Sequence, residues 1–154
     1  MSLGQLVRTD VVTATRGTAI REAASSLAEH NIGSLVVVEG DRPVGVLTDR
    51  DIALKVVAKG LDPEATVVED VMSQPVRCLE EGDGLFGAID EMAEHGIRRL
   101  PVVDDRGRLV GLLTLDDLLT LLVAEFALLE GVLLAQSKVG RQSTLTKLET
   151  FGEP

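Results

Sequence analysis

The chain has 154 residues, of which 45% are hydrophobic and 26% are charged, and this is enough for one globular domain with a buried core. The formal net charge of -10 argues against nucleic acid and anionic membranes as partners, because both require a basic surface. A single cysteine, Cys78, excludes an internal disulfide framework, and two histidines offer no metal-site spacing. We therefore expect no metal and a reducing, cytoplasmic setting.

In chain order, the first predicted elements are a short strand around Thr13, an amphipathic helix and a hairpin. Apolar residues spaced i, i+3, i+4, i+7 and i+8 over residues 20–28 indicate the helix, which Thr18 should cap and which should end near Asn31. The stretch "SLVVVEGDRPVGVLT" is an apolar run, a Gly/Asp turn and a second apolar run, which is typical of a hairpin. A second helix is expected after Thr48.

The second half of the chain repeats this order. The segment "AEHNIGSLVVV" from Ala28 aligns with "AEHGIRRLPVV" from Ala93, and the helical spacing recurs from Leu85, with Asp83 as the expected cap and Gly96 near the helix end. Below about 60 residues, one such unit buries too little surface to be comfortably stable alone. We therefore predict an α/β (α+β) fold of two β-α-β-β-α repeats that pack sheet to sheet.

Composition and the repeat divide the chain into four segments. We assign the first repeat to residues 7–62, a Pro- and Gly-punctuated linker to residues 63–72, the second repeat to residues 73–123, and a C-terminal helix with a polar tail to residues 124–154.

From Leu118 to Leu134 apolar residues cover nearly every helical direction, interrupted by Glu125 and Glu130. We interpret this region as too interrupted for a membrane span and as a helix buried against protein. A helix that is apolar all round must be covered, and a chain of this size has little core left to cover it. We therefore expect a homodimer in which this helix packs against its symmetry mate.

One motif occurs in both repeats. The stretch "GVLTDRDI" of residues 45–52 returns as "GLLTLDDL" at residues 111–118. The pattern Thr-x-x-Asp is typical of a capping box, in which Thr and Asp satisfy each other's backbone N–H groups. Both copies also lie where a strand leads into a helix N-terminus, which favours phosphate, and an Asp carboxylate there can accept the paired hydroxyls of a ribose. Capping and ligand binding both remain open.

With these motifs, the chain resembles the paired CBS domain, or Bateman module, named after cystathionine β-synthase. The resemblance covers about residues 7–123 and rests on "DVMSQPV", "GIRRLPV" and the two Gly-h-h-Thr-x-x-Asp motifs, where h is apolar. It implies two repeats packed about a pseudo-twofold axis, with two clefts that commonly hold adenosyl ligands.

The resemblance also implies a set of site residues. Asp51 and Asp117 match the ribose-binding acid, and Thr48 and Thr114 match the hydroxyl on the phosphate side. A phosphate is expected to draw Arg50 from one repeat and Arg99 from the other. Since the chain has no Trp or Tyr, adenine should lie between aliphatic side chains. The remaining implied site residues are Gly33, Ser34, Gly96, Ile97, Arg98, Pro101 and Thr13.

We therefore expect a non-catalytic regulatory module that binds AMP, ADP, ATP, S-adenosylmethionine or NAD and passes its ligand state to an unidentified protein partner. The alternative is a scaffold or dimerisation module in which Thr-x-x-Asp serves only as a helix cap. No Walker loop, nucleophile elbow or GxGxxG pattern is present, so an enzyme is not expected.

Overall fold

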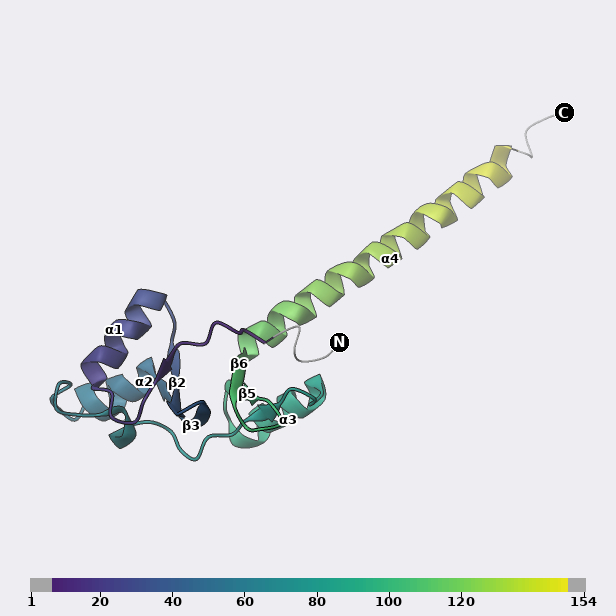
Figure 1. The fold of residues 1–154 in the computed structure, drawn as a ribbon. Helices are drawn as coiled ribbons and strands as arrows, with labels where there is room; N and C mark the ends of the chain where they lie inside the picture. The colour runs from purple at the N-terminus through teal and green to yellow at the C-terminus, as the bar shows by residue number, and fades with distance from the viewer. Residues whose placement is uncertain (1–6, 150–154) are drawn as a thin grey trace. The chain divides into compact units, whose positions relative to one another are not determined.

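The computed structural model describes the backbone of residues 7–149 and the side chains of residues 7–136 (Figure 1). The chain divides after Leu115 into two compact units, which are described in turn.

The first unit contains both repeats, and each follows the predicted β-α-β-β order. The helix that completes the first repeat begins as a short α-helix and continues as a π-helix. The elements of the first repeat are β1 (Thr13–Ala14), α1 (Ile20–His30), β2 (Ser34–Glu39), β3 (Arg42–Thr48), α2 (Asp49–Asp51) and η2 (Ile52–Val57). After a 3-10 turn, η3 (Val68–Asp70), come β4 (Leu79–Glu80), α3 (Leu85–His95), β5 (Arg99–Val103) and β6 (Leu109–Thr114).

Each repeat has a three-stranded sheet with the same topology, β1-β2-β3 and β4-β5-β6. The leading strand is parallel to the first hairpin strand, and the hairpin is antiparallel. Matching apolar pairs, Leu35 with Leu47 and Leu100 with Leu113, lie opposite each other, and all four side chains are fully buried. The predicted α+β class and the internal repeat are confirmed.

The two repeats are joined through an exchange of their leading segments. Arg8, ahead of the first repeat's sheet, pairs with Leu112 of β6 through N–H···O distances of 3.1 and 3.0 Å. Ser73, ahead of the second repeat's sheet, pairs in the same way with Val46 of β3 at 3.1 and 2.9 Å. This reciprocal pairing is what a pseudo-twofold relation between the repeats requires.

The exchange explains why the repeated motif begins with glycine. A Cβ on Gly45 would lie 2.5 Å from Met72 Sδ and 3.1 Å from the Ser73 carbonyl oxygen. A Cβ on Gly111 would lie 2.8 Å from the Arg8 carbonyl oxygen. In each repeat the crossing segment of the other repeat therefore occupies the space that a side chain would need.

The two predicted helix caps are wrong. The N-cap of α1 is Ala19 and that of α3 is Gly84, and neither helix has a side-chain cap. Thr18 Oγ1 instead accepts from the Thr15 N–H at 3.1 Å, and Asp83 Oδ2 accepts from the Glu80 N–H at 2.8 Å. Both side chains close the turn before the helix and are not free to cap it.

The predicted helix ends are confirmed. Asn31 and Gly96 follow α1 and α3 with φ of 51° and 62°, in the left-handed region that ends helices.

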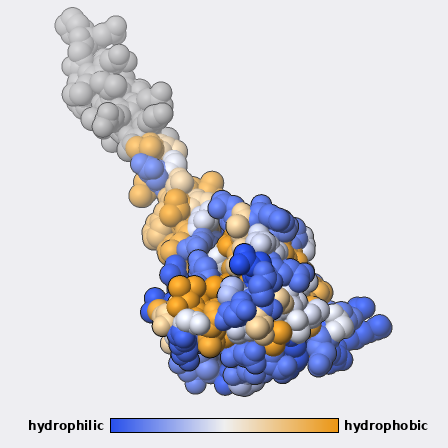
Figure 2. All heavy atoms as spheres, turned by 90° about the vertical axis from the view of Figure 1, so that its left-hand side faces the viewer, coloured by the Kyte–Doolittle hydropathy of each residue, from blue (hydrophilic) through white to orange (hydrophobic). Residues whose placement is uncertain are grey.

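The second unit is the helix that continues the second repeat, α4 (Leu115–Glu149). Its stretch Leu115–Gln136 is long and apolar enough, by length and composition alone, to cross a membrane, which is weak evidence for a span. The expectation that Glu125 and Glu130 interrupt it too strongly is therefore not supported by its hydropathy. The expected burial is not provided by the described chain either, since large apolar side chains on α4 are exposed (Figure 2).

Candidate functional site

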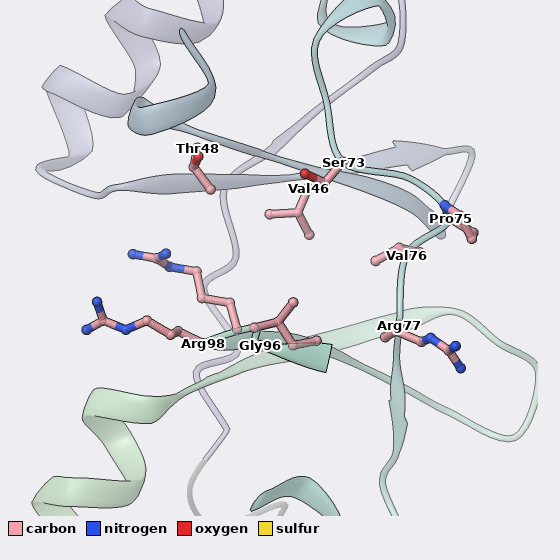
Figure 3. Close-up of a pocket in the computed structure, with 10 residues that line it drawn as sticks. Val46, Thr48, Ser73, Pro75, Val76, Arg77, Gly96 and Arg98 are labelled. Carbon is pink, nitrogen blue, oxygen red and sulfur yellow. The ribbon is translucent and has the colours of Figure 1, made fainter. Parts of the chain in front are cut away.

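A cavity of about 270 Å³ lies between the two repeats. Val46 and Thr48 of β3 border it on one side, and Gly96 and Arg98 border it on the other (Figure 3). The crossing segment that follows Ser73 closes a third side. The complete lining is Val46, Thr48, Ser73, Pro75, Val76, Arg77, Gly96, Ile97, Arg98 and Arg99.

The cavity is positively charged although the chain is acidic overall. Three arginines, Arg77, Arg98 and Arg99, belong to its lining, but the exposed side chain of Arg77 points away from the cavity (Figure 3). None of its described lining residues is acidic. A guanidinium group can donate two parallel hydrogen bonds to a phosphate or carboxylate. Since charges beyond about 8 Å are largely screened at physiological salt, the nearby charged groups, Arg98, Arg99 and the Asp49 carboxylate, set the local field more than the net charge of -10 does.

Arg99 connects the two repeats. It begins β5 of the second repeat, yet a Cβ on Gly33 of the first repeat would lie only 3.2 Å from its Nη2 atom. The same Cβ would lie 3.4 Å from Asp49 Oδ2, so the guanidinium and this carboxylate both border Gly33. The absence of a side chain at Gly33 therefore leaves room for Arg99 to extend across the boundary between the repeats.

Thr48 and Asp51 form a complete capping box. Thr48 Oγ1 accepts from the Asp51 N–H at 3.1 Å, and Asp51 Oδ2 accepts from the Thr48 N–H at 3.0 Å and from Thr48 Oγ1 at 2.7 Å. Asp51 Oδ1 is 2.8 Å from Lys55 Nζ, which also donates to the Val71 carbonyl oxygen at 2.6 Å. These contacts occupy three of the roughly four acceptor positions of a carboxylate, which leaves about one for a ligand hydroxyl.

The contacts of Asp51 change its pKa. Burial by itself raises the pKa of this carboxyl, but hydrogen bonds from Lys55 and Thr48 outweigh burial, so the pKa lies below its ordinary value. The ionised form of Asp51 therefore stabilises the folded chain.

We expect acid to remove this stabilisation. Because the folded-state pKa of Asp51 is lowered, its contribution is present above the unfolded value of about 3.9 and is lost as pH falls through the folded value. Asp51→Asn should therefore make the free energy of unfolding less dependent on pH below about 4, measured by urea unfolding from pH 3 to 7. Glu29→Gln, at an exposed position of α1, is the matched control, since it removes one carboxylate outside the capping box. An unchanged pH dependence in Asp51→Asn would contradict this assignment.

In the second repeat, Thr114 ends β6 opposite Arg99, in the first unit of the chain. Asp117 lies in the first turn of α4, in the second unit.

The structure brings five of the implied site residues to the cavity: Thr48, Gly96, Ile97, Arg98 and Arg99. The others lie elsewhere among the described residues. Gly33 borders a neighbouring pocket between α1 and α2, Ser34 is buried in β2 opposite Thr48, and Pro101 is fully buried in β5. Arg50 and Thr13 are exposed and do not line the cavity. The sharing of a phosphate between Arg50 and Arg99 stays a prediction.

Sequence reasoning missed half of the lining. Val46, Ser73, Pro75, Val76 and Arg77 are absent from the implied set. Four of them belong to the segment containing "SQPVR", which is remote in sequence from β3 and reaches the cavity only through the Ser73–Val46 pairing. The motif "DVMSQPV" within this segment contributed to the family resemblance, but no local periodicity indicates that its residues border a cleft.

Outside the cavity, the histidines have equivalent contacts. His30 Nδ1 is 2.9 Å from the Ser26 carbonyl oxygen, and His95 Nδ1 is 3.1 Å from that of Glu91. His95, Glu91 and Glu94 each place one potential ligand atom within 4.8 Å of the others, an arrangement that surface acidic groups often form without a metal.

Burial raises the pKa of the Cys78 thiol, which disfavours the reactive thiolate.

A family model described as the CBS domain matches residues 3–58 and 68–124, and the chain therefore belongs to the CBS-domain family, as a tandem pair. An uncharacterized protein of Methanopyrus kandleri is 43% identical over 120 residues, which are 77% of this chain and 61% of that protein.

Two solved structures similar to this chain contain adenosyl ligands. The CBS domain pair of protein MJ0100, in complex with 5′-methylthioadenosine and S-adenosyl-L-methionine, has a TM-score of 0.73 and 29% identity, covering 81% of this chain and 98% of that one. A CBS domain protein from Pyrobaculum aerophilum, complexed with AMP, has a TM-score of 0.69 and 31% identity, covering 76% of this chain and 89% of that one.

Proposed function

We propose that this chain is a regulatory module that binds a phosphorylated adenosine, such as AMP, ADP or ATP, in the cavity between its repeats. The observation that carries the proposal is the pair of arginines, Arg98 and Arg99, in the lining of a largely apolar cavity whose described lining contains no acidic residue. The ligands in the structures of MJ0100 and the Pyrobaculum aerophilum protein support the adenosyl part.

The chemistry of the lining separates the parts of such a ligand. Val46, Pro75, Val76 and Ile97 offer apolar contacts for adenine, which suits a chain without Trp or Tyr. The arginines offer charge-assisted hydrogen bonds to phosphate oxygens. The same arginines repel the positively charged sulfonium of S-adenosylmethionine, so we propose a nucleotide as the ligand in preference to S-adenosylmethionine. NAD, which carries phosphates, remains a candidate ligand.

Thermal unfolding of the full chain against AMP, ADP, ATP, NAD, S-adenosylmethionine and unphosphorylated adenosine tests the proposal. A ligand at 100 times its Kd adds about 2.7 kcal/mol to the free energy of unfolding. For a chain of this size this raises the midpoint by roughly 5 to 11 °C. We expect such a rise for at least one nucleotide and a smaller one for adenosine and S-adenosylmethionine. A rise that is equal for adenosine and AMP would contradict the role of the arginines.

The capping box favours a second function, that of a scaffold whose cavity stays empty. The Thr48–Asp51 contacts fully account for the motif as a helix cap without any ligand. If no adenosyl compound changes the unfolding midpoint, the scaffold is the function that remains.

In either function, we propose that the chain works as a cytoplasmic homodimer that contacts a further protein. A ligand that binds one arrangement of the two repeats better than another shifts their equilibrium by its difference in affinity. A partner that contacts both repeats would detect that shift.

A further inference from the structure

The described part of α4 is apolar nearly all round, and one set of its exposed large apolar side chains, which we call the seam, follows a regular spacing; Val123, Leu128, Val132 and Leu134 are exposed outside this set. The seam residues are spaced by three, four, three and four positions, the spacing of the core positions of a coiled coil. Every one is exposed by half or more in the described chain. The seam consists of Leu119, Leu122, Phe126, Leu129 and Leu133.

Acidic side chains border the seam on both sides. Glu125 and Glu130 are the two charged residues between Leu118 and Gln136. With 3.6 residues per turn, Glu125 falls on one edge of the seam and Glu130 on the other. These are the positions that flank a coiled-coil core and remain in contact with water, so an aqueous helix pair leaves both carboxylates solvated.

The charges also distinguish the two orientations of such a pair. In a parallel, in-register pair, a residue that flanks the core on one helix faces the residue five positions later on the other helix. Glu125 of one copy would therefore lie beside Glu130 of the other. Two carboxylates would then repel each other on each side of the seam. In an antiparallel pair centred between Phe126 and Leu129, Glu125 of one helix and Glu130 of the other lie on opposite sides of the seam.

We propose that α4 packs antiparallel against α4 of a second copy of this chain along the seam. Phe126 of each copy packs against Leu129 of the other, and Leu122 against Leu133. The inference rests on the homodimer proposed above and is independent of the nucleotide. It goes beyond the family match, which ends at residue 124.

A bilayer is the other environment that would cover an apolar helix of this length. A span would place Glu125 and Glu130 near the middle of the hydrocarbon, where acidic side chains are costly and rare. The antiparallel pair avoids that cost, although it covers the seam and not Val123, Leu128, Val132 and Leu134.

Disulfide trapping in the full chain tests the proposal. In a Cys78→Ser background, Leu122→Cys and Leu133→Cys are made singly and together, and each protein is oxidised and run on a non-reducing gel. Within one helix these two positions are about 16 Å apart, too far for an internal disulfide. We expect covalent dimers in the double variant at least tenfold above either single variant. Covalent dimers in both single variants would indicate a parallel pair, and their absence from all three would remove the helix pair; either result overturns the proposal.

Two charge variants and a vesicle assay complete the test. In the double-cysteine background, Phe126→Glu should abolish the covalent dimer, whereas Ala124→Glu, exposed on the opposite side of α4, should preserve it. Flotation of the parent chain with phosphatidylcholine vesicles should leave the protein unbound; co-flotation without trapping would assign α4 to the bilayer and overturn the proposal. Nucleotide binding by the same variants is measured in parallel, so that a failure of the cavity is distinguished from a failure of the helix pair.

Discussion

Arg99→Ala should weaken AMP binding by roughly 10- to 100-fold, as measured by isothermal titration calorimetry. A hydrogen bond to a charged group contributes about 1.5–3 kcal/mol, and each 1.4 kcal/mol is a factor of ten in Kd. Arg99 lines the cavity from the second repeat and reaches Gly33 of the first, so its loss removes a phosphate donor and a contact between the repeats.

Arg106→Ala is the matched control. Arg106 is an exposed arginine in the turn between β5 and β6, outside the cavity lining, and its removal changes the net charge of the chain equally. We expect its AMP affinity to stay within twofold of the parent. If both variants lose affinity equally, the effect comes from net charge, and the assignment of Arg99 to the phosphate is wrong.

Gly111→Ala should lower the free energy of unfolding by about 1–3 kcal/mol, since inserting a methyl group into a closely packed site forces backbone or side-chain shifts. Its Cβ would overlap the Val7 side chain and lie 2.8 Å from the Arg8 carbonyl oxygen, and backbone cannot move aside as a flexible side chain can. In thermal unfolding, each kcal/mol corresponds to roughly 2–4 °C for a chain of this size.

Two other glycines test this explanation. Gly45→Ala should cost less than Gly111→Ala, because its nearest obstacle is the flexible Met72 side chain and not the branched Val7, and its nearest carbonyl oxygen, that of Ser73, lies at 3.1 Å and not at 2.8 Å. Gly87→Ala, in α3 with open space around it, should raise the free energy of unfolding by about 0.5–1 kcal/mol, since alanine favours helix. A Gly111→Ala variant as stable as Gly87→Ala would show that the crossing segment does not restrict this position.

Much of the fold was predictable because its signals are local. The i, i+3, i+4, i+7 spacing from Ile20 and Leu85 located α1 and α3. The apolar runs around Gly/Asp turns located both hairpins. The misplaced caps, Thr18 and Asp83, show the limit of such signals: a polar side chain before a helix can equally close the preceding turn, and backbone geometry decides between the two.

For the candidate site, one side of the cavity was more predictable from the sequence than the other. The resemblance implied the strand start at Gly96 to Arg99 and the hydroxyl of Thr48, and these residues line the cavity. Arg77 and Val76 were missed because they follow a crossing segment whose partner, β3, is far away along the chain. The ion pair between the Asp51 carboxylate and Lys55 could not be predicted from the sequence either, since Lys55 is only one of several cationic side chains that could have contacted Asp51.

The sequence by itself determined that the chain is one β-α-β-β-α repeat written twice and that a Thr-x-x-Asp motif, open to capping or to ligand binding, follows the hairpin of each repeat. Periodicity and turn residues act over a few positions, so they can be read without the fold. Only the tertiary structure decided that each leading segment pairs with the other repeat, that Gly45 and Gly111 make room for it, and that Arg98 and Arg99 of the second repeat meet Thr48 of the first at one cavity. Those features depend on contacts between segments that are far apart in the sequence, and no local sequence pattern encodes such contacts.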